Sequence, residues 1–255
     1  MLLAPIALLA LVLLAGCNSA SVDTDITGDY RVEGGLVQNI NADSVFAVAV
    51  FSRNDSNLIA ASVFINDDSL KYNDPLAAVS SAYFAGLDSL RKFAGGQPEL
   101  RLKDATRFSD TIAGPAADTF SIISFVPPNH LIQGNGQVSL EWGASANAEA
   151  YVLAAVKASE AYTGEGYSLY APLAATGGTI PPDAFILAGT TEADTGLYNV
   201  YVYALTGSPD SALTAPLLPV PLPDQLSDNI SVVNLAGRFG SVMVALRDTV
   251  RVSQQ

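Results

Sequence analysis

Two short patterns in the chain have the residue types of an acyl-transfer site. Ser89 and Lys92 are three residues apart, and Ser227 is followed by Asp228 and Asn229. A serine becomes a nucleophile when a neighbouring base takes its proton, and Lys92 would lie one turn from Ser89 if Ser89 began a helix. Three-residue patterns recur by chance, and these two lie in segments that we assign to different structural units. We therefore predict no catalytic residues and no enzymatic activity.

The same patterns resemble motifs of the serine β-lactamases and penicillin-binding proteins. That family also uses a Lys-Thr-Gly element, and the sequence contains none. The resemblance implies a serine hydrolase of the penicillin-binding type that works through Ser89 and Lys92. We keep this activity as the last of the functional alternatives.

His130 is the single histidine of the chain. It follows two prolines and an asparagine, where we expect a solvated linker between two domains. Zinc sites usually combine several histidine or cysteine ligands. A lone histidine therefore predicts neither a zinc site nor a catalytic triad.

Calcium is a different case, because it binds oxygen atoms of Asp, Asn and backbone carbonyls. Two groups of such residues occur, namely Asn66, Asp67 and Asp68, and further along Asp23, Asp25 and Asp29. Neither group has the spacing of an EF-hand loop, so we expect acids of ordinary turns and tethers and no bound cofactor. If calcium binds, the turn Asn66–Asp68 or the domain junction is the expected place.

Five tyrosines form the candidate binding surface. They are Tyr162, Tyr167 and Tyr170 in an expected loop over 160–170, and Tyr201 and Tyr203 on an expected strand. Tyrosine combined with glycine is the composition of adaptable recognition loops, and planar rings also stack on sugars. Alternation along the strand predicts that Tyr201 and Tyr203 point outward, opposite its core-facing side chains. The alternative is that these tyrosines only cover a face of a β-sandwich.

The only cysteine, Cys17, follows an apolar run over 2–16 that carries no charge. The run is shorter than the roughly 20 residues that span a bilayer, and it ends in small residues, as signal peptides do. The sequence Leu-Ala-Gly-Cys at 14–17 resembles the lipobox of bacterial lipoproteins. This resemblance implies cleavage before Cys17 and acylation of its sulfur. Only Met1 precedes the run, so an ordinary secretory signal or a short membrane anchor are the alternatives.

Asn18 bears on the destination of such a lipoprotein. In enteric bacteria an aspartate at this position retains lipoproteins in the inner membrane, and the chain has asparagine there. We therefore expect a cell-envelope protein in the outer membrane, anchored by its acyl chains. The resemblance implies that Cys17 carries several acyl chains. Several acyl chains would anchor the protein stably, because a single acyl chain gives only marginal membrane binding.

Charge and cysteine content narrow the classes of partner and of fold. The formal net charge is −13, which argues against nucleic acid because phosphates would repel the chain. A single cysteine allows no disulfide within the chain, so packing must provide the stability. Asp outnumbers Glu, and Asp favours turns and loops over helices. These features favour a protein or polysaccharide partner.

Short strands separated by Gly, Pro, Asn and Asp predict an all-β fold with two Ig-like β-sandwich modules. Strands are expected at 44–51, 58–65, 69–72, 79–85, 99–103, 119–126, 138–142, 150–157, 198–204, 230–235, 241–246 and 249–252. A helix over 80–93 is the alternative for one of them. The predicted divisions are a signal peptide at 1–16, a tether at 17–28, a sandwich at 29–126, a linker at 127–136, a second sandwich at 137–224, and a C-terminal β-hairpin unit at 225–255. This last unit has apolar faces that we expect to complete one of the sandwiches.

The second sandwich resembles a fibronectin type III domain. Three segments carry the resemblance: Val138-x-Leu140-x-Trp142, Ala150-Tyr151 and Tyr198-x-Val200-x-Val202-x-Ala204, which match strands B, C and F of that family. The resemblance implies that Trp142 and Tyr198 face the core between two sheets. The family usually has a leucine six residues before the F-strand tyrosine, and here that position is Glu192.

These features together predict a noncatalytic, lipid-anchored interaction or scaffold module of the cell envelope. A surface glycan-binding lipoprotein is the first alternative, since accessory proteins of polysaccharide uptake resemble tandem Ig-like modules on a lipid anchor.

Overall fold

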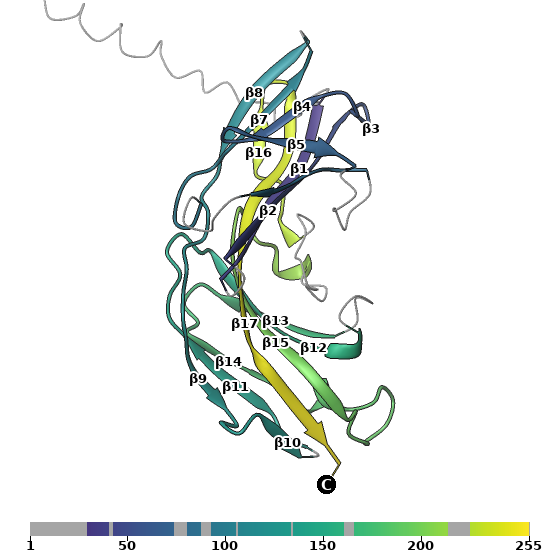
Figure 1. The fold of residues 1–255 in the computed structure, drawn as a ribbon, viewed down its shortest axis with the longest axis vertical. Helices are drawn as coiled ribbons and strands as arrows, with labels where there is room; N and C mark the ends of the chain where they lie inside the picture. Colours follow the sequence, from purple (N-terminus) through teal and green to yellow (C-terminus); the bar gives the residue numbers. More distant parts are fainter. Residues whose placement is uncertain are drawn as a thin grey trace, which may run out of the picture.

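The computed structural model describes residues 30–40, 43–73, 81–87, 93–105, 107–133, 135–160, 166–213 and 225–254 (Figure 1). The regular structure of these residues consists of β-strands and short 3-10 turns. Within the same ranges, no helix is long and apolar enough to cross a bilayer. The predicted all-β class is therefore confirmed. Outside the described residues lie Cys17 with the predicted signal peptide and tether, Asp23, Asp25, Asp29, Ser89, Lys92 and Tyr162.

The N-terminal lobe is a sandwich made from a sheet that folds over on itself. Its strands are β1 (Tyr30–Asn39), β2 (Ser44–Arg53), β3 (Ser56–Asn57), β4 (Ser62–Ile65), β5 (Asp68–Tyr72), β6 (Tyr83–Leu87), β7 (Glu99–Asp104) and β8 (Phe108–Ala113). They follow the order β1-β2-β6-β5-β4-β7-β8. The sheet turns at β5, because the first three residues of β5 pair with β4 and the last two with β6. Alternating apolar side chains of both layers, including Val32, Phe51 and Leu100, meet in the core.

The segment around Tyr83 is a strand, so the alternative helix over 80–93 is wrong for residues 83–87. Tyr83 pairs with Ala49 of β2 and with Tyr72 of β5. Its side chain is buried in the core. The tertiary pairing on both sides of β6 therefore determines the conformation.

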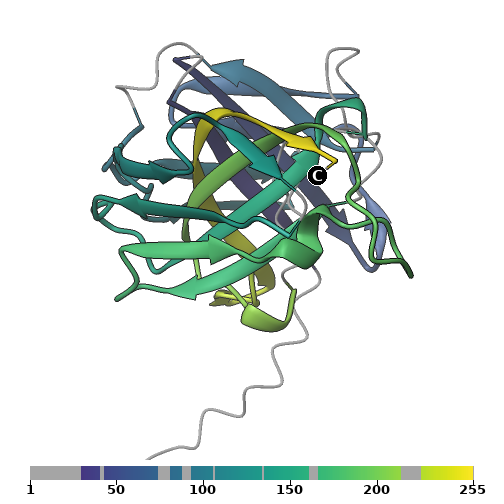
Figure 2. The same ribbon diagram turned by 90° about the horizontal axis from the view of Figure 1, so that it is seen from below.

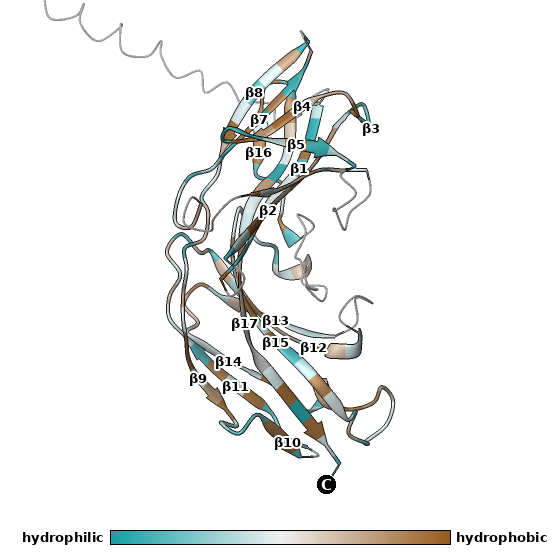
Figure 3. Ribbon diagram, viewed as in Figure 1, coloured by the Kyte–Doolittle hydropathy of each residue, from teal (hydrophilic) through white to brown (hydrophobic). Residues whose placement is uncertain are grey.

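The C-terminal lobe is a sandwich of two separate sheets. A three-stranded sheet has the order β14-β11-β9, and the facing sheet has the order β13-β12-β15-β17. The bounds are β9 (Ile122–Val126), β11 (Val138–Trp142), β12 (Ala150–Lys157), β13 (Tyr167–Pro172), β14 (Gly177–Ile180), β15 (Gly196–Thr206) and β17 (Leu235–Ser253). Figure 2 shows the lobe from its free end, and Figure 3 shows apolar residues recurring along its strands. Short 3-10 turns occur at η2 (Ala158–Glu160), η3 (Pro182–Phe185) and η4 (Ser211–Leu213).

The residues behind the predicted fibronectin type III-like sandwich lie as expected. β11 belongs to one sheet, and β12 and β15 are neighbours in the other. Trp142 and Tyr198 are buried between them, at 0% and 4% exposure. Trp142 also packs on Tyr151, with 5.6 Å between ring centroids. The predicted β-sandwich of the C-terminal half is confirmed by this arrangement.

A single strand, β17, runs through both lobes. It has 19 residues, and residues 235–244 pair in parallel with β1 while 241–252 pair antiparallel with β15. β16 (Ile230–Val232) forms a hairpin with its start, and β10 (Leu131–Gln133) pairs with its end. The expectation of two separate strands at 241–246 and 249–252 is wrong, because one continuous strand covers both segments. The C-terminal segment therefore contributes to both sandwiches.

Two glycines explain why the sequence pattern ended one predicted strand at 235 and began the next at 241, although β17 is continuous over these residues. Gly237 and Gly240 look like breaks between strands, but both lie within β17. A Cβ at Gly237, where φ is +135°, would lie 1.9 Å from the carbonyl oxygen of Val32, and a Cβ at Gly240 would lie 2.2 Å from that of Thr206. These glycines allow close approach of neighbouring strands and do not form turns.

Buried polar side chains join the lobes where β17 passes between them. The Thr206 hydroxyl donates to the carbonyl oxygen of Pro115 at 2.6 Å. The Ser241 hydroxyl lies 3.0 Å from the Thr206 hydroxyl, and it accepts the backbone N–H of Ala117 at 2.8 Å. Gln38 of β1 donates to the Ala117 carbonyl at 3.2 Å. The segment between β8 and β9 is thus hydrogen-bonded to β1, β15 and β17.

Candidate functional site

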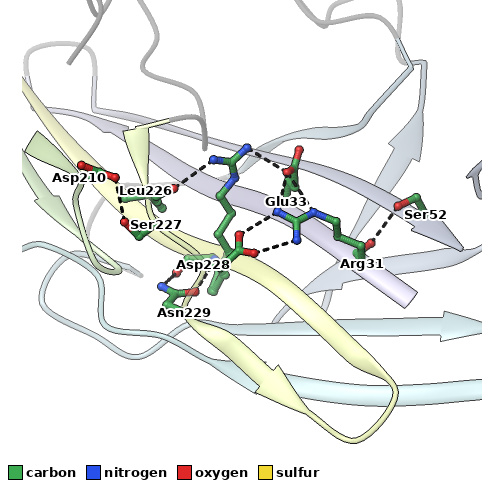
Figure 4. A network of polar contacts seen from close by, with 10 residues as sticks. Arg31, Glu33, Ser52, Asp210, Leu226, Ser227, Asp228 and Asn229 are labelled. Carbon is green, nitrogen blue, oxygen red and sulfur yellow. Dashed lines mark hydrogen bonds and ion pairs between the residues drawn. The ribbon is translucent and has the colours of Figure 1, made fainter. Parts of the chain in front are cut away.

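The Ser227-Asp228-Asn229 pattern makes structural contacts (Figure 4). Asp228 accepts two hydrogen bonds from Arg31 of β1, at 2.8 and 2.9 Å. The Asn229 side chain accepts the backbone N–H of Phe239 at 3.0 Å and donates to the carbonyl oxygen of the same residue at 2.8 Å. It also donates to the carbonyl oxygen of Gly207 at 2.8 Å. Ser227 donates to Asp210 at 3.2 Å. The three side chains fasten this segment to β1, β17 and the end of β15.

Arg31 dominates the electrostatics of Asp228. Its hydrogen bonds lower the pKa of Asp228, and they outweigh the effect of burial. Arg31 and Arg238 also contact Glu33, at 3.1 and 2.9 Å. Asp228 is therefore held as a carboxylate, and its role is to form an ion pair with Arg31.

The turn at Asn66 and Asp67 is occupied by a cation of the protein itself. The Arg101 guanidinium donates to the carbonyl oxygen of Asn66, and it contacts the Asp67 carboxylate at 3.2 Å. The Asn66 side-chain oxygen accepts the backbone N–H of Glu99 at 2.9 Å. Two of the three suggested calcium ligands, Asn66 and Asp67, are thus engaged within the protein, and Asp68 lies at the start of β5. Among the described residues, no group of three or more His, Cys, Asp or Glu could hold a metal ion.

His130 lies against a strand, which corrects the expectation of a solvated linker residue. Its ring stacks on Phe125 with 4.5 Å between centroids. Its carbonyl oxygen accepts the N–H of Arg251, and Leu131–Gln133 then form β10. Pairing with the end of β17 orders this segment.

Tyr201 and Tyr203 lie on the predicted face, but the expectation that they are exposed is wrong. They are 8% and 0% exposed, and their rings stack with centroids 5.7 Å apart. A second hydrophobic cluster forms on this face because the sheet continues through β17 into β1. Its buried members are Val37, Val152, Ala154, Val156, Tyr201, Tyr203, Leu205, Val242 and Val244. Burial, with Tyr201 nearby, raises the pKa of Tyr203 well above its ordinary value.

The expected loop over 160–170 ends in a strand, because residues 167–172 form β13. Tyr170 pairs with Val152 and packs on the second hydrophobic cluster. Tyr167 pairs with Ala155 and packs on the main core cluster. Side chains an odd number of residues apart in a strand lie on opposite faces, so Tyr167 and Tyr170 do not form one surface.

Tyr167 lines an open cleft at the free end of the C-terminal lobe. The cleft has a volume of about 480 Å³, which lies in the usual range of small-ligand sites. Its polar lining includes Lys157, Tyr167, Asp183, Asp194 and Tyr198. Apolar residues between 184 and 188 complete the lining.

One wall of this cleft is formed by an ion pair between Lys157 and Asp194, whose charges are neutralised within the protein. The Lys157 ammonium group contacts the Asp194 carboxylate, and both side chains are 21% exposed. Tyr198 donates to the same carboxylate at 2.6 Å. Burial alone would raise the pKa of Asp194, but the hydrogen bonds from Lys157 and Tyr198 outweigh it and lower the pKa. Asp194 is therefore ionised at neutral pH.

The other wall is a short projection held by its own hydrogen bonds. Ile186 and Ala193 form an isolated β-bridge. Inside it, Thr190 donates its backbone N–H and its hydroxyl to the carbonyl oxygen of Leu187, at 3.0 and 2.9 Å. Glu192, which stands where the family pattern has leucine, lies in this projection. Asp183 stands at its base, exposed in η3.

Sequence reasoning identified Tyr167 but missed its neighbours in the cleft. Lys157, Asp183 and Asp194 belong to no motif, and the first two are 26 positions apart in the sequence (183 − 157). The pairing of β12 with β13 and β15 brings Lys157 close to Tyr167 and Tyr198. The bridge between Ile186 and Ala193, with the hydrogen bond from the Asp194 N–H to the Phe185 carbonyl oxygen, brings Asp194 close to the turn that holds Asp183. The apolar-to-charged change at the end of the predicted strand 150–157 is the only local signal.

Comparisons with known proteins show no family. No family model and no curated protein matches the chain. Among solved structures, the chain is similar to chicken CNTN1 FN1–FN3 domains, with 11% identity, a TM-score of 0.24, and coverage of 68% of this chain and 57% of that one. It is also similar to the mouse nectin-like molecule 4 ectodomain (Ig1–Ig3), with 10% identity, a TM-score of 0.23, and coverage of 89% and 64%. The chain thus spans less than two thirds of the length of either. These scores are low, so the fold assignment rests on the strand pairing.

Proposed function

We propose that the chain is a noncatalytic interaction protein of the cell envelope, tethered through an acylated Cys17. The supporting observation is the separation of the cleft from the point where the tether would enter. Tyr30, the first described residue, pairs with Leu235 at one end of β17, and Gly196 pairs with Val252 near the other. These 17 steps (252 − 235) of about 3.3 Å place the two ends about 55 Å apart along the strand. A membrane tether at the first end leaves the cleft near the other end of β17, because Tyr198, which lines the cleft, pairs with Val250. Figure 1 shows β17 running from one lobe into the other.

The arrangement of the lobes supports an interaction role over a catalytic one. β17 and the contacts of Thr206, Ser241 and Gln38 join the lobes into one unit. Sandwiches of the Ig and fibronectin type III type commonly serve as interaction modules. The Ser-Asp-Asn side chains have structural partners. We therefore propose that the two joined lobes act as a rigid spacer, which presents the end of the protein far from the tether to a partner.

Two experiments test the proposal. The anchor predicts that the full chain incorporates labelled palmitate and fractionates with membranes, and that Cys17→Ser abolishes the label and releases the chain. The interaction predicts specific photo-crosslinks in cells from a reactive residue at Leu187, which lines the cleft and is 43% exposed. The same reactive residue at Val126, 53% exposed on β9, is the matched control. Identical crosslinks at both positions, or none at Leu187, would contradict the interaction.

Catalysis by acyl transfer is tested separately. A penicillin-type acylating probe should leave the protein unlabelled under conditions where a penicillin-binding protein reacts. Covalent labelling that Ser89→Ala abolishes would replace this proposal with a serine hydrolase.

Glycan binding is the second candidate, and the cleft is the observation that favours it. Tyr167 offers a ring, and Asp183 offers a carboxylate that can accept hydrogen bonds from sugar hydroxyls. The candidate predicts that the protein binds a polysaccharide on an array and that Tyr167→Ala weakens binding. An array without signal at high protein concentration would eliminate it. Tyr201 and Tyr203 do not contribute to this candidate, because they are buried.

A further inference from the structure

The cleft beside Tyr167 carries an unbalanced negative charge. Lys157 and Asp194 neutralise each other, and Tyr198 completes the hydrogen bonding of the pair. Asp183 is exposed on the same cleft. Among the described residues that line the cleft, its carboxylate has no ion pair, so these lining residues together carry one net negative charge. The chain as a whole is also acidic, at −13.

Aromatic and apolar surfaces lie next to this carboxylate. Tyr167 is half-buried, and burial together with the Asp183 charge raises the pKa of its hydroxyl. Asp183 and Tyr167 both line this cleft. Leu187 is 43% exposed, and Ala188 is also exposed on the cleft. A ligand can thus contact a carboxylate, an aromatic ring and an aliphatic surface at one place.

We infer that this cleft binds a basic side chain of a partner protein, with the cationic group at Asp183 and Tyr167 and the aliphatic stem against Leu187 and Ala188. A cation near a carboxylate and an aromatic ring gains both an ionic and a cation–π attraction. Lysine and arginine have alkyl stems that pack on apolar surface while the charged group stays near water. The inference rests on the proposed interaction function and names the partner chemistry of its site.

The same charges disfavour other ligands. An anionic sugar or phosphate would meet Asp183 and the acidic surface, and the ammonium group of Lys157 is already paired with Asp194. A neutral oligosaccharide would gain hydrogen bonds but no ionic attraction. Its binding would therefore change little when the charge of Asp183 is removed.

Ligand-observed NMR with short peptides tests the inference on the full chain in a neutral detergent. The probes are Gly-Gly-Lys-Gly-Gly and the same peptide with Nε-acetyl-lysine. Acetylation removes the charge and should weaken binding about three- to fivefold, the factor expected for a partly exposed ion pair. Asp183→Asn should weaken binding of the lysine peptide by the same factor, and Asp183→Glu should restore it. Glu141→Gln removes an equal charge from the exposed side of β11 and should have no effect.

Several results would overturn the inference. They are equal binding of both peptides, unchanged binding by Asp183→Asn, equal loss in Glu141→Gln, and binding of maltohexaose that is stronger than that of the lysine peptide and insensitive to Asp183→Asn. Crosslinks at Leu187 without peptide binding would remove this inference while the interaction function stands. Absence of those crosslinks would remove the interaction function itself.

Discussion

The hydroxyl groups of Thr206 and Ser241 lie 3.0 Å apart at the point where the two lobes meet. Thr206 ends β15, and Ser241 is near the middle of β17. Both are buried, and both also bind the backbone of residues 115–117. A pair of small hydroxyl side chains thus joins β15, β17 and the segment that connects the lobes.

Replacing Ser241 by alanine should destabilise the protein by about 1–3 kcal/mol. The backbone N–H of Ala117 would lose its acceptor in a buried site, which costs the desolvation of that group. Urea unfolding followed by circular dichroism measures the change. Ser231→Ala, on the exposed side of β16, is the control and should stay within about 0.5 kcal/mol of wild type. Equal midpoints for the two variants would contradict the role of this junction.

Gly237→Ala should lower the free energy of unfolding by more than about 2 kcal/mol. A Cβ at this position would lie 1.9 Å from the carbonyl oxygen of Val32, and φ is +135°, so the pairing of β1 with β17 must distort. Gly86→Ala is the matched control, because a Cβ there meets nothing within 4 Å. Thermal unfolding of the two variants compares them directly, and a tolerated Gly237→Ala would argue against the parallel pairing.

The buried and cleft-lining tyrosines should respond differently to truncation. Tyr203→Ala removes a fully buried ring and should cost about 3–5 kcal/mol, as large-to-small core changes do. Tyr167→Ala removes a half-buried ring and should cost clearly less. Denaturant unfolding gives both values. A small effect at Tyr203 would show that this face is not packed.

Removing the Lys157 charge should raise the pKa of Asp194. In the wild type, hydrogen bonds from Lys157 and Tyr198 overcome burial and hold this pKa below its ordinary value of 3.8. Lys157→Met leaves burial opposed by Tyr198 alone. Carboxyl-carbon NMR of the two proteins over pH 2–7 should show Asp194 titrating higher in the variant. An unchanged titration would mean that the ion pair does not form in solution.

The pH dependence of stability follows from the direction of the same shift. A carboxyl group with a lowered pKa in the folded state stabilises the protein above its ordinary pKa, and this contribution is lost as pH falls through the lower folded value. Lys157→Met should therefore cost about 1 kcal/mol at pH 7. The difference from wild type should shrink below about pH 4. A difference that stays constant down to pH 2 would assign the loss to packing.

Local patterns predicted much of the C-terminal sandwich. Val138, Leu140 and Trp142 alternate with polar residues, and Tyr198, Val200 and Val202 follow the same period. Side chains in a strand point alternately to opposite faces, so the period alone indicated which residues face the core. It also indicated that Tyr201 and Tyr203 share the opposite face. What it could not indicate was the burial of that face, because Val37 and Val242 come from distant parts of the chain.

By itself the sequence determined an all-β chain, many of its strand-forming segments, its acidity and the single cysteine at position 17, because each depends on residue type or on neighbours close in the chain. Only the tertiary structure decided that β17 is one strand shared by both lobes, since Gly237 and Gly240 look like breaks until Val32 and Thr206 are placed beside them. The same holds for the cleft. Lys157 and Tyr167 come together through the pairing of β12 with β13 and β15, and the bridge between Ile186 and Ala193 brings Asp194 close to the turn with Asp183. No local pattern encodes which of these distant segments pair.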